Sequence, residues 1–206
     1  MEPIQATIRI ERGRIQSVEP MLGGVKIISE TGIDFYPDCW ALPGFVDSHA
    51  HILGLGSKLR GLSLYGAESA EECVGRAIMH SVTRGGWIIG MGWNQQLWTV
   101  KQYPTKHYLD SAFEDVPVYL SRADGHAAWV NSKALAIAGV VASTPNPSGG
   151  EIQKDKSGNP TGILIDNAMD LVRKFIPAHT IDEQISMLRS SADHCISHGI
   201  TEVHDM

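Results

Sequence analysis

The pattern of hydrophobic and polar positions changes character near residue 42. Before it, the segment ATIRIERGRIQSV alternates apolar and polar residues on either side of Gly13, which predicts a β-hairpin. After it, the run LPGFVD is apolar on both faces, which is typical of a strand inside a covered parallel sheet. We therefore expect residues 1–41 to form a small β piece and residues 42–206 to form a second domain.

Strand-like and helix-like segments alternate in the second part. WIIGMGW, VPVYLSRAD and the final ITEVHDM predict strands, whereas AAWVNSKALAIAG predicts a helix that ends at Gly139. Residues 143–162 are rich in Gly, Pro, Ser and Asn and predict a loop followed by a hairpin that turns around residues 157–160. This alternation favours βα units and a parallel sheet, hence an α/β fold.

Two capping-box patterns predict the starts of further helices. Ser69 is followed three residues later by a glutamate and then by an apolar stripe that includes Val82, which predicts a helix that extends to Gly85. Thr180 has the same relationship to Glu183, and this helix is expected to end near His198, with Gly199 after it.

Composition and charge exclude several classes of protein. The 206 residues carry a formal charge of −6 without any Lys/Arg-rich run, which argues against a nucleic-acid or anionic-membrane partner. The N-terminal segment lacks the apolar core of a signal peptide, and no uninterrupted apolar run is long enough for a membrane span. Three cysteines, Cys39, Cys73 and Cys195, lie far apart and are expected to be reduced, buried thiols in a cytoplasmic protein.

The candidate chemistry lies in LPGFVDSHAHI, where two histidines end the apolar run. Alternate residues of a strand point to the same face, so Asp47, His49 and His51 project together and the two imidazoles can bind one metal ion. About 0.4 such His-x-His pairs are expected by chance in a chain of this composition, so the spacing alone leaves a structural role open. The absence of a neighbouring cysteine favours an open catalytic metal site over a closed structural one.

Several longer motifs sharpen this interpretation. LPGFVDSHAHI resembles the first-strand motif of the amidohydrolase superfamily, which comprises metal-dependent hydrolases on a (β/α)8 barrel. GWNQQLW, SRADGHAAWVNSKAL, SGGEIQKDKSGNPTGILIDNAM and GITEVHDM follow in order and resemble the amidohydrolase 3 branch, which includes N-substituted formamide deformylases. The resemblance covers nearly the whole chain.

The resemblance implies a partial (β/α)8 barrel with a family-specific insertion at about residues 60–170. Residues 1–41 would be the N-terminal β piece of a composite β-sandwich. His49 and His51 would be metal ligands, with Asp47 as a candidate partner behind them. The expected reaction is hydrolysis of a C–N bond in a small amide-type substrate, with a divalent ion, expected to be zinc, that activates water and polarises the carbonyl.

Much of the family's site has no counterpart in these residues. A lysine or glutamate on a middle strand, two later histidines and the last-strand aspartate that acts as general base would all lie beyond Met206. A complete barrel takes about 250 residues. We therefore expect an incomplete fragment that is inactive alone, and its oligomeric state, including a homo-oligomer, is left open.

Other residues are weaker candidates for the substrate pocket. His126 is expected in a strand-to-helix loop, where substrate groups are usually met, although a local helix-entry role is the alternative. Trp93, Asn94 and Trp98 have two alternative roles: they line the pocket, or they belong to an aromatic core. Glu151 reaches the site or is a solvated hairpin carboxylate, and His204 lies at the end of the last predicted strand. Arg122 and Asp124 are expected to form a structural ion pair.

His194 and His198 form an i, i+4 pair, but the sequence between them lacks the glutamate of a metalloprotease helix. Interaction with the helix C-terminus accounts for them. Two alternatives to an amidohydrolase remain open. One is a non-catalytic remnant or subunit that keeps the fold without a complete metal site, and the other is a deaminase or a lactone hydrolase.

Overall fold

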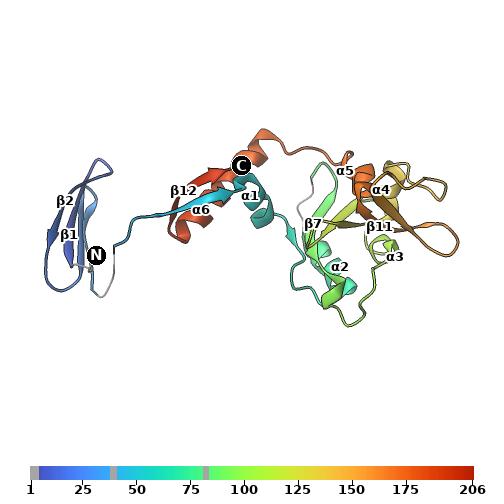
Figure 1. The fold of residues 1–206 in the computed structure, drawn as a ribbon, viewed down its shortest axis with the longest axis horizontal. Helices are drawn as coiled ribbons and strands as arrows, with labels where there is room; N and C mark the ends of the chain where they lie inside the picture. The colour runs from blue at the N-terminus through green and yellow to red at the C-terminus, as the bar shows by residue number, and fades with distance from the viewer. Residues whose placement is uncertain (1–4, 38–40, 81–83) are drawn as a thin grey trace. The chain divides into compact units, whose positions relative to one another are not determined.

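The computed structural model describes residues 5–37, 41–80 and 84–206. Cys39 and Val82, which carried sequence predictions, lie outside these residues. The chain divides into two compact units, one made of Met1–Asp47 with Gly199–His204 and the other of Ser48–His198 with Asp205–Met206 (Figure 1).

The first unit contains a four-stranded sheet of order β2-β1-β3-β4. Its strands are β1 Ala6–Glu11, β2 Arg14–Pro20, β3 Val25–Ser29 and β4 Gly32–Tyr36. β1 pairs with β2 in antiparallel fashion and with β3 in parallel. The predicted hairpin is confirmed, and Gly13 adopts a φ of 69° at its turn.

Strands β5 (Phe45–Ala50) and β12 (Ile200–Asp205) form a two-stranded sheet. The Phe45 N–H donates to Gly199 O and the Met206 N–H donates to Ala50 O, so the pair runs parallel. The strand was expected to be buried on both faces, yet Phe45 is 59% exposed. In the described sheet β5 pairs only with β12, so the apolar side chains of β5 remain accessible to solvent.

Helix α1 (Ile52–Arg60) follows β5 directly, and α6 (Ile181–Ser197) leads into β12. The two helices pack against each other. Later residues of α1 lie beside earlier residues of α6, so the helices run antiparallel. The Ser191 hydroxyl donates to Ile52 O at 2.7 Å near one end of the contact. Further along, Gly56 lies so close to Met187 that a Cβ at position 56 would be 2.2 Å from the Met187 carbonyl oxygen.

A six-stranded sheet of order β10-β11-β9-β8-β7-β6 forms the larger part of the second unit. Its strands are β6 Leu62–Ser63, β7 Ile88–Trp93, β8 Val118–Arg122, β9 Ala127–Val130, β10 Gly150–Lys154 and β11 Pro160–Asp166. β6, β7 and β8 run parallel, whereas β8, β9, β11 and β10 pair in antiparallel fashion. The sheet is therefore mixed, and the prediction of a parallel sheet holds only for its first three strands.

Short helices accompany this sheet: α2 Ala70–Met79, α3 Lys106–Asp110, α4 Ser132–Ile137, α5 Asp170–Arg173, and the 3-10 turns η1 Gln95–Leu97 and η2 Asn167–Met169. Two buried clusters use alternate residues of the strands, so they lie on opposite faces of the sheet. Side chains of α2 and α3 join one cluster and those of α4 and α5 join the other. Among the described residues, none of the helices has the length and hydrophobicity to cross a membrane.

The prediction of a helix over residues 127–139 is wrong in its first part. Ala127–Val130 forms the buried strand β9, because β8 and β11 pair with it on both edges and override the helix propensity of the alanines. The buried Asn131 then ends the strand and begins α4, since its side-chain oxygen accepts from the Ala134 N–H at 3.0 Å and from the Val118 N–H.

The two capping predictions have different outcomes. The full capping box at Thr180 and Glu183 is confirmed at the start of α6. At α2 the Ser69 hydroxyl accepts from the Glu72 N–H, but the Glu72 carboxylate accepts from the Glu68 N–H rather than from Ser69. α2 also ends at Met79, earlier than the predicted Gly85.

Candidate functional site

His49 lies near the C-terminal end of β5, and His51 immediately precedes α1. Their ring centroids are 5.3 Å apart with an interplanar angle of 80°. With metal–nitrogen bonds of about 2.0–2.1 Å and tetrahedral angles, two histidines on one ion have ring centroids about 5 Å apart. The separation of the two rings therefore matches that of two histidines on one ion.

The His51 ring is oriented by a main-chain contact. Its Nδ1 lies 3.2 Å from the Met206 carbonyl oxygen, which can only accept, so Nδ1 carries the proton. The Nε2 lone pair is thereby left for a metal ion, and such a hydrogen bond is the usual way a ligating histidine is held. Asp205 also fixes the backbone next to His51, because its Oδ1 accepts a hydrogen bond from the Ile52 N–H at 2.8 Å.

The described residues offer few side chains that could bind a metal ion together. Within residues 5–37, 41–80 and 84–206, no three His, Cys, Asp or Glu side chains are close enough together to hold a metal ion. Two neutral imidazoles suit a borderline ion such as zinc and need further ligands. Among the described residues, His49 and His51 would therefore need ligands from elsewhere to complete a metal site.

His126 lies in the turn between β8 and β9, so it joins two strands rather than a strand and a helix as expected. Its Nδ1 is 2.8 Å from Oδ1 of Asp166, the last residue of β11. The His126 N–H donates to Asp124 Oδ1 at 3.0 Å. The imidazole is therefore tethered through its ring and its backbone while its side chain remains 70% exposed.

Asp166 was not singled out from the sequence. Its backbone has φ 47° and ψ −123°, which falls outside the left-handed helical region that aspartate sometimes adopts. Such a conformation costs about 1–3 kcal/mol and persists only where the surroundings impose it. No sequence signal pointed to Asp166, because its partner lies forty positions away in the chain.

Arg122 and Asp124 form the ion pair that the sequence predicted. Two bonds, at 2.9 and 2.6 Å, join the guanidinium to the carboxylate, and Arg122 also donates to the Tyr103 hydroxyl. The hydrogen bonds from Arg122 hold the pKa of Asp124 below its usual value. Asp124 thus remains ionised as an acceptor for the His126 backbone.

The other predicted pocket residues occupy different environments. Trp93 has no exposed surface, its indole N–H donates to Leu120 O, and its ring contacts Trp129 edge to face. Trp98 is likewise buried, and Asn94 caps η1.

Two charged candidates lie on exposed surfaces. Glu151 is exposed on β10, opposite Ile165 of β11. His204 is exposed on β12 and lies 3.2 Å from Glu202. His194 and His198 have ring centroids 4.4 Å apart at the end of α6, where His198 Nδ1 donates to the His194 carbonyl.

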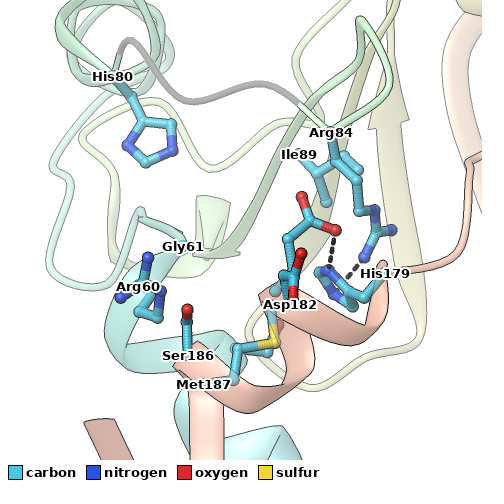
Figure 2. A pocket seen from close by; sticks show the side chains of 11 residues that line it. Arg60, Gly61, His80, Arg84, Ile89, His179, Asp182, Ser186 and Met187 are labelled. Carbon is cyan, nitrogen blue, oxygen red and sulfur yellow. Dashed lines mark hydrogen bonds and ion pairs between the residues drawn. The ribbon is translucent and has the colours of Figure 1, made fainter. Parts of the chain in front are cut away.

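A cavity of about 540 Å³ lies between the C-terminal end of α1, the N-terminal part of α6 and the sheet (Figure 2). Arg84 and His179 meet in it, with Arg84 Nη1 donating to His179 Nε2 at 2.6 Å. Burial and the adjacent Arg84 lower the pKa of His179, and His179 Nδ1 lies 3.8 Å from Glu183. The sequence did not indicate this cavity, since its residues come from distant segments.

Comparison with known proteins gives a consistent result. A model described as "Amidohydrolase family" matches residues 38–206. YtcJ of Bacillus subtilis (strain 168), a provisional amidohydrolase by its name, is 41% identical over 167 residues, which cover 79% of this chain and 31% of YtcJ. The N-substituted formamide deformylase of Arthrobacter pascens is 29% identical over 172 residues, covering 80% of this chain and 32% of that enzyme. The chain therefore spans about a third of the length of these curated relatives.

Solved structures support the fold. A metal-dependent hydrolase of uncharacterised function from Pyrococcus horikoshii OT3 matches 99% of this chain and 42% of its own, with a TM-score of 0.64 and 22% identity. A similar protein from Pyrococcus furiosus matches with a TM-score of 0.63 and 24% identity. These similarities concern the fold of the matched region.

Proposed function

Because this chain belongs to the amidohydrolase family, we propose that it forms part of a metal-dependent hydrolase that cleaves a C–N bond in a small amide-type substrate. His49 and His51 are two of its metal ligands. The observation that carries this proposal is the pair of imidazoles, 5.3 Å apart, at the C-terminal end of a strand. Hydrolase barrels place their active sites at that end of their strands.

Zinc is the ion that we propose for this site. Bound there, it would lower the pKa of a water molecule to about 7 and polarise the carbonyl under attack. The chain's own contribution is a hydrogen bond from the His51 Nδ1–H to Met206 O, which would leave Nε2 as the nitrogen that could hold the ion. The α1–α6 contact at Gly56 and the Asp205 bond to Ile52 fix the backbone that carries this histidine.

We propose that the remaining ligands and the general-base carboxylate lie outside these 206 residues. The relatives extend well beyond the matched region, which leaves room for them. The name of the Arthrobacter relative suggests N-substituted formamides as a substrate class for this protein as well. A barrel completed by that additional sequence would cover the exposed face of β5.

A non-catalytic remnant or subunit is the second candidate. It is favoured by the lack of any three-ligand group in the parts of the chain that the structure describes. Metal content separates the two candidates, because a remnant binds no ion with or without the additional sequence.

The proposed localisation is the cytoplasm. Cys73 and Cys195 are buried and unpaired, as thiols in a reducing compartment are. Burial raises the pKa of the Cys73 thiol to about 12, so the thiol stays protonated.

The native gene product assayed with N-substituted formamides, primary amines and lactones tests the reaction. We expect hydrolysis of the formamides, its loss after treatment with a chelator, and its recovery with zinc. Turnover of lactones or amines without turnover of any amide would instead assign a lactone hydrolase or a deaminase.

A further inference from the structure

A cavity whose lining does not include the proposed metal ligands contains charged groups that are incompletely paired. It is the cavity of about 540 Å³ between α1, α6 and the sheet, and its volume is typical of small-molecule sites (Figure 2). Arg84 and His179 lie on one side of it, and Arg60 and His80 lie on the other. Cationic or protonatable side chains therefore face the cavity from two directions.

The backbone of Arg84 is fixed by a two-residue turn. Arg84 and Trp87 exchange both of their main-chain hydrogen bonds, at 2.9 and 3.0 Å. Gly85 and Gly86 between them have φ values of 55° and 83°, which a tight turn of this kind requires. A Cβ at Gly85 would clash with the ring of Pro177, so the turn packs directly against the segment that carries His179.

The Arg84 guanidinium forms no ion pair with a carboxylate of the described residues. Its Nη1 donates to His179 Nε2 at 2.6 Å, and its Nε is buried without an acceptor in the described part of the chain. The charge of Glu183 acts on it, but Glu183 Oε2 already accepts from the N–H and the hydroxyl of Thr180. Burial lowers the pKa of Arg84, as expected for a desolvated cation.

His179 carries a second donor that lacks an acceptor. Because the guanidinium can only donate, His179 Nε2 accepts and the proton of the neutral ring resides on Nδ1. This Nδ1 is buried, finds no acceptor among the described residues, and lies 3.8 Å from Glu183 Oε2, beyond hydrogen-bond distance. Buried donors without acceptors are rare in proteins and call for a bound partner.

The rest of the lining indicates the charge and polarity of that partner. Arg60, in the last turn of α1, is a second guanidinium without an ion pair among the described residues. Asp182 and Glu183 both lie in the first turn of α6, where the positive end of the helix dipole offsets their charge. The cavity thus favours an anion, but the two carboxylates disfavour a multiply charged one. Ile89 and Met187 add apolar surface.

We infer that this cavity binds the carboxylate group of a small organic acid. The Arg84 guanidinium holds the carboxylate, Arg60 contributes the second positive charge, and the apolar body of the ligand lies against Ile89 and Met187. The planar fork of an arginine matches a carboxylate through two parallel hydrogen bonds. Because the site uses neither the metal ligands nor turnover, it is independent of the proposed hydrolysis.

Calorimetric titration of the native gene product with benzoate and benzamide tests the inference, because the two ligands share a ring and differ in charge. We expect saturable binding of benzoate and binding of benzamide that is weaker by about tenfold or more. Inorganic phosphate should bind more weakly than benzoate. Benzoate binding should persist in His49→Ala, which separates this cavity from a carboxylate bound to the metal.

Three variants distinguish the cavity from other positive surfaces. Arg84→Gln should weaken benzoate binding by about tenfold or more. Arg173→Gln is the matched control, because Arg173 pairs with Asp170 outside the cavity, and it should leave the affinity unchanged. Asp182→Asn removes a like charge from the lining and should tighten benzoate binding several-fold, a gain that a misfolded protein would not show.

Several outcomes would overturn the inference. They are the absence of saturable benzoate binding, equal binding of benzamide, tighter binding of phosphate, loss of benzoate binding in His49→Ala, and an affinity that Arg84→Gln or Asp182→Asn leaves unchanged. None of them requires hydrolysis to be measured, so they are distinct from a failure of the proposed function.

Discussion

His51 Nδ1 lies 3.2 Å from the carbonyl oxygen of Met206, which links the end of β5 to the end of β12. The same two strand ends are joined by the Ile52 N–H and the Asp205 carboxylate. The two parallel strands therefore present their C-terminal ends side by side, and the His51 ring is held there through its Nδ1. This relationship, more than the spacing of the histidines, supports the proposal that His51 is a metal ligand.

The contact between α1 and α6 should be sensitive to a single methyl group. Gly56→Ala would place a Cβ 2.2 Å from Met187 O, so we expect the free energy of unfolding to fall by about 1–3 kcal/mol. Gly75→Ala is the matched control, because Gly75 lies in α2 with nothing within 4 Å, and it should gain about 0.5–1 kcal/mol. Chemical denaturation measures both, and equal effects of the two substitutions would contradict the packing.

The backbone strain at Asp166 predicts a stabilising substitution. Asp166→Gly relieves about 1–3 kcal/mol of strain but adds a glycine entropy cost of about 0.5–1 kcal/mol and removes an exposed ion pair. We expect a net gain of about 1 kcal/mol, or roughly 2–4 °C in Tm. Asp170→Gly, at a residue with an ordinary φ of −67°, should lower the Tm. If Asp166→Gly also lowers the Tm, Asp166 carries no strain.

His179 predicts a pH dependence of stability. Its pKa is lowered in the folded protein by burial and by Arg84, so the unfolded chain binds the proton more readily. The stabilisation is complete above the unfolded pKa of about 6.5 and is lost as the pH falls below it toward the folded pKa. Unfolding free energies at pH 8 and pH 5 should therefore differ less in His179→Gln than in the wild type.

Gln can still accept the hydrogen bond from Arg84, so this variant removes the titration and retains a partner for the guanidinium. His107→Gln is the control, since the His107 side chain is 79% exposed, and it should keep the wild-type pH dependence. A pH profile that His179→Gln leaves unchanged would show that His179 titrates alike in the folded and unfolded states.

Local patterns predicted those elements whose causes are local. The hairpin at Gly13 and the capping box at Thr180 depend on residues close in sequence, and both are confirmed. Residues 127–130 were predicted as helix because alanines favour it, but the strand at that position is imposed by β8 and β11. Only knowledge of its neighbours in the sheet could have corrected this.

The candidate site shows the same division. His49 and His51 could be singled out because a strand's alternation places them on one face. Asp166 could not, because its pairing with His126 depends on the hairpin of β10 and β11 returning beside β9. The family motifs marked the segments that converge there but not the bond between them.

The bound metal of the native gene product is the most direct test of the central claim that His49 and His51 ligate a metal ion. Elemental analysis of the purified protein should find a divalent metal, expected to be zinc, that is lost in His49→Ala and in His51→Ala and retained in His194→Ala. A protein without metal, or one whose metal survives both substitutions, would contradict the claim.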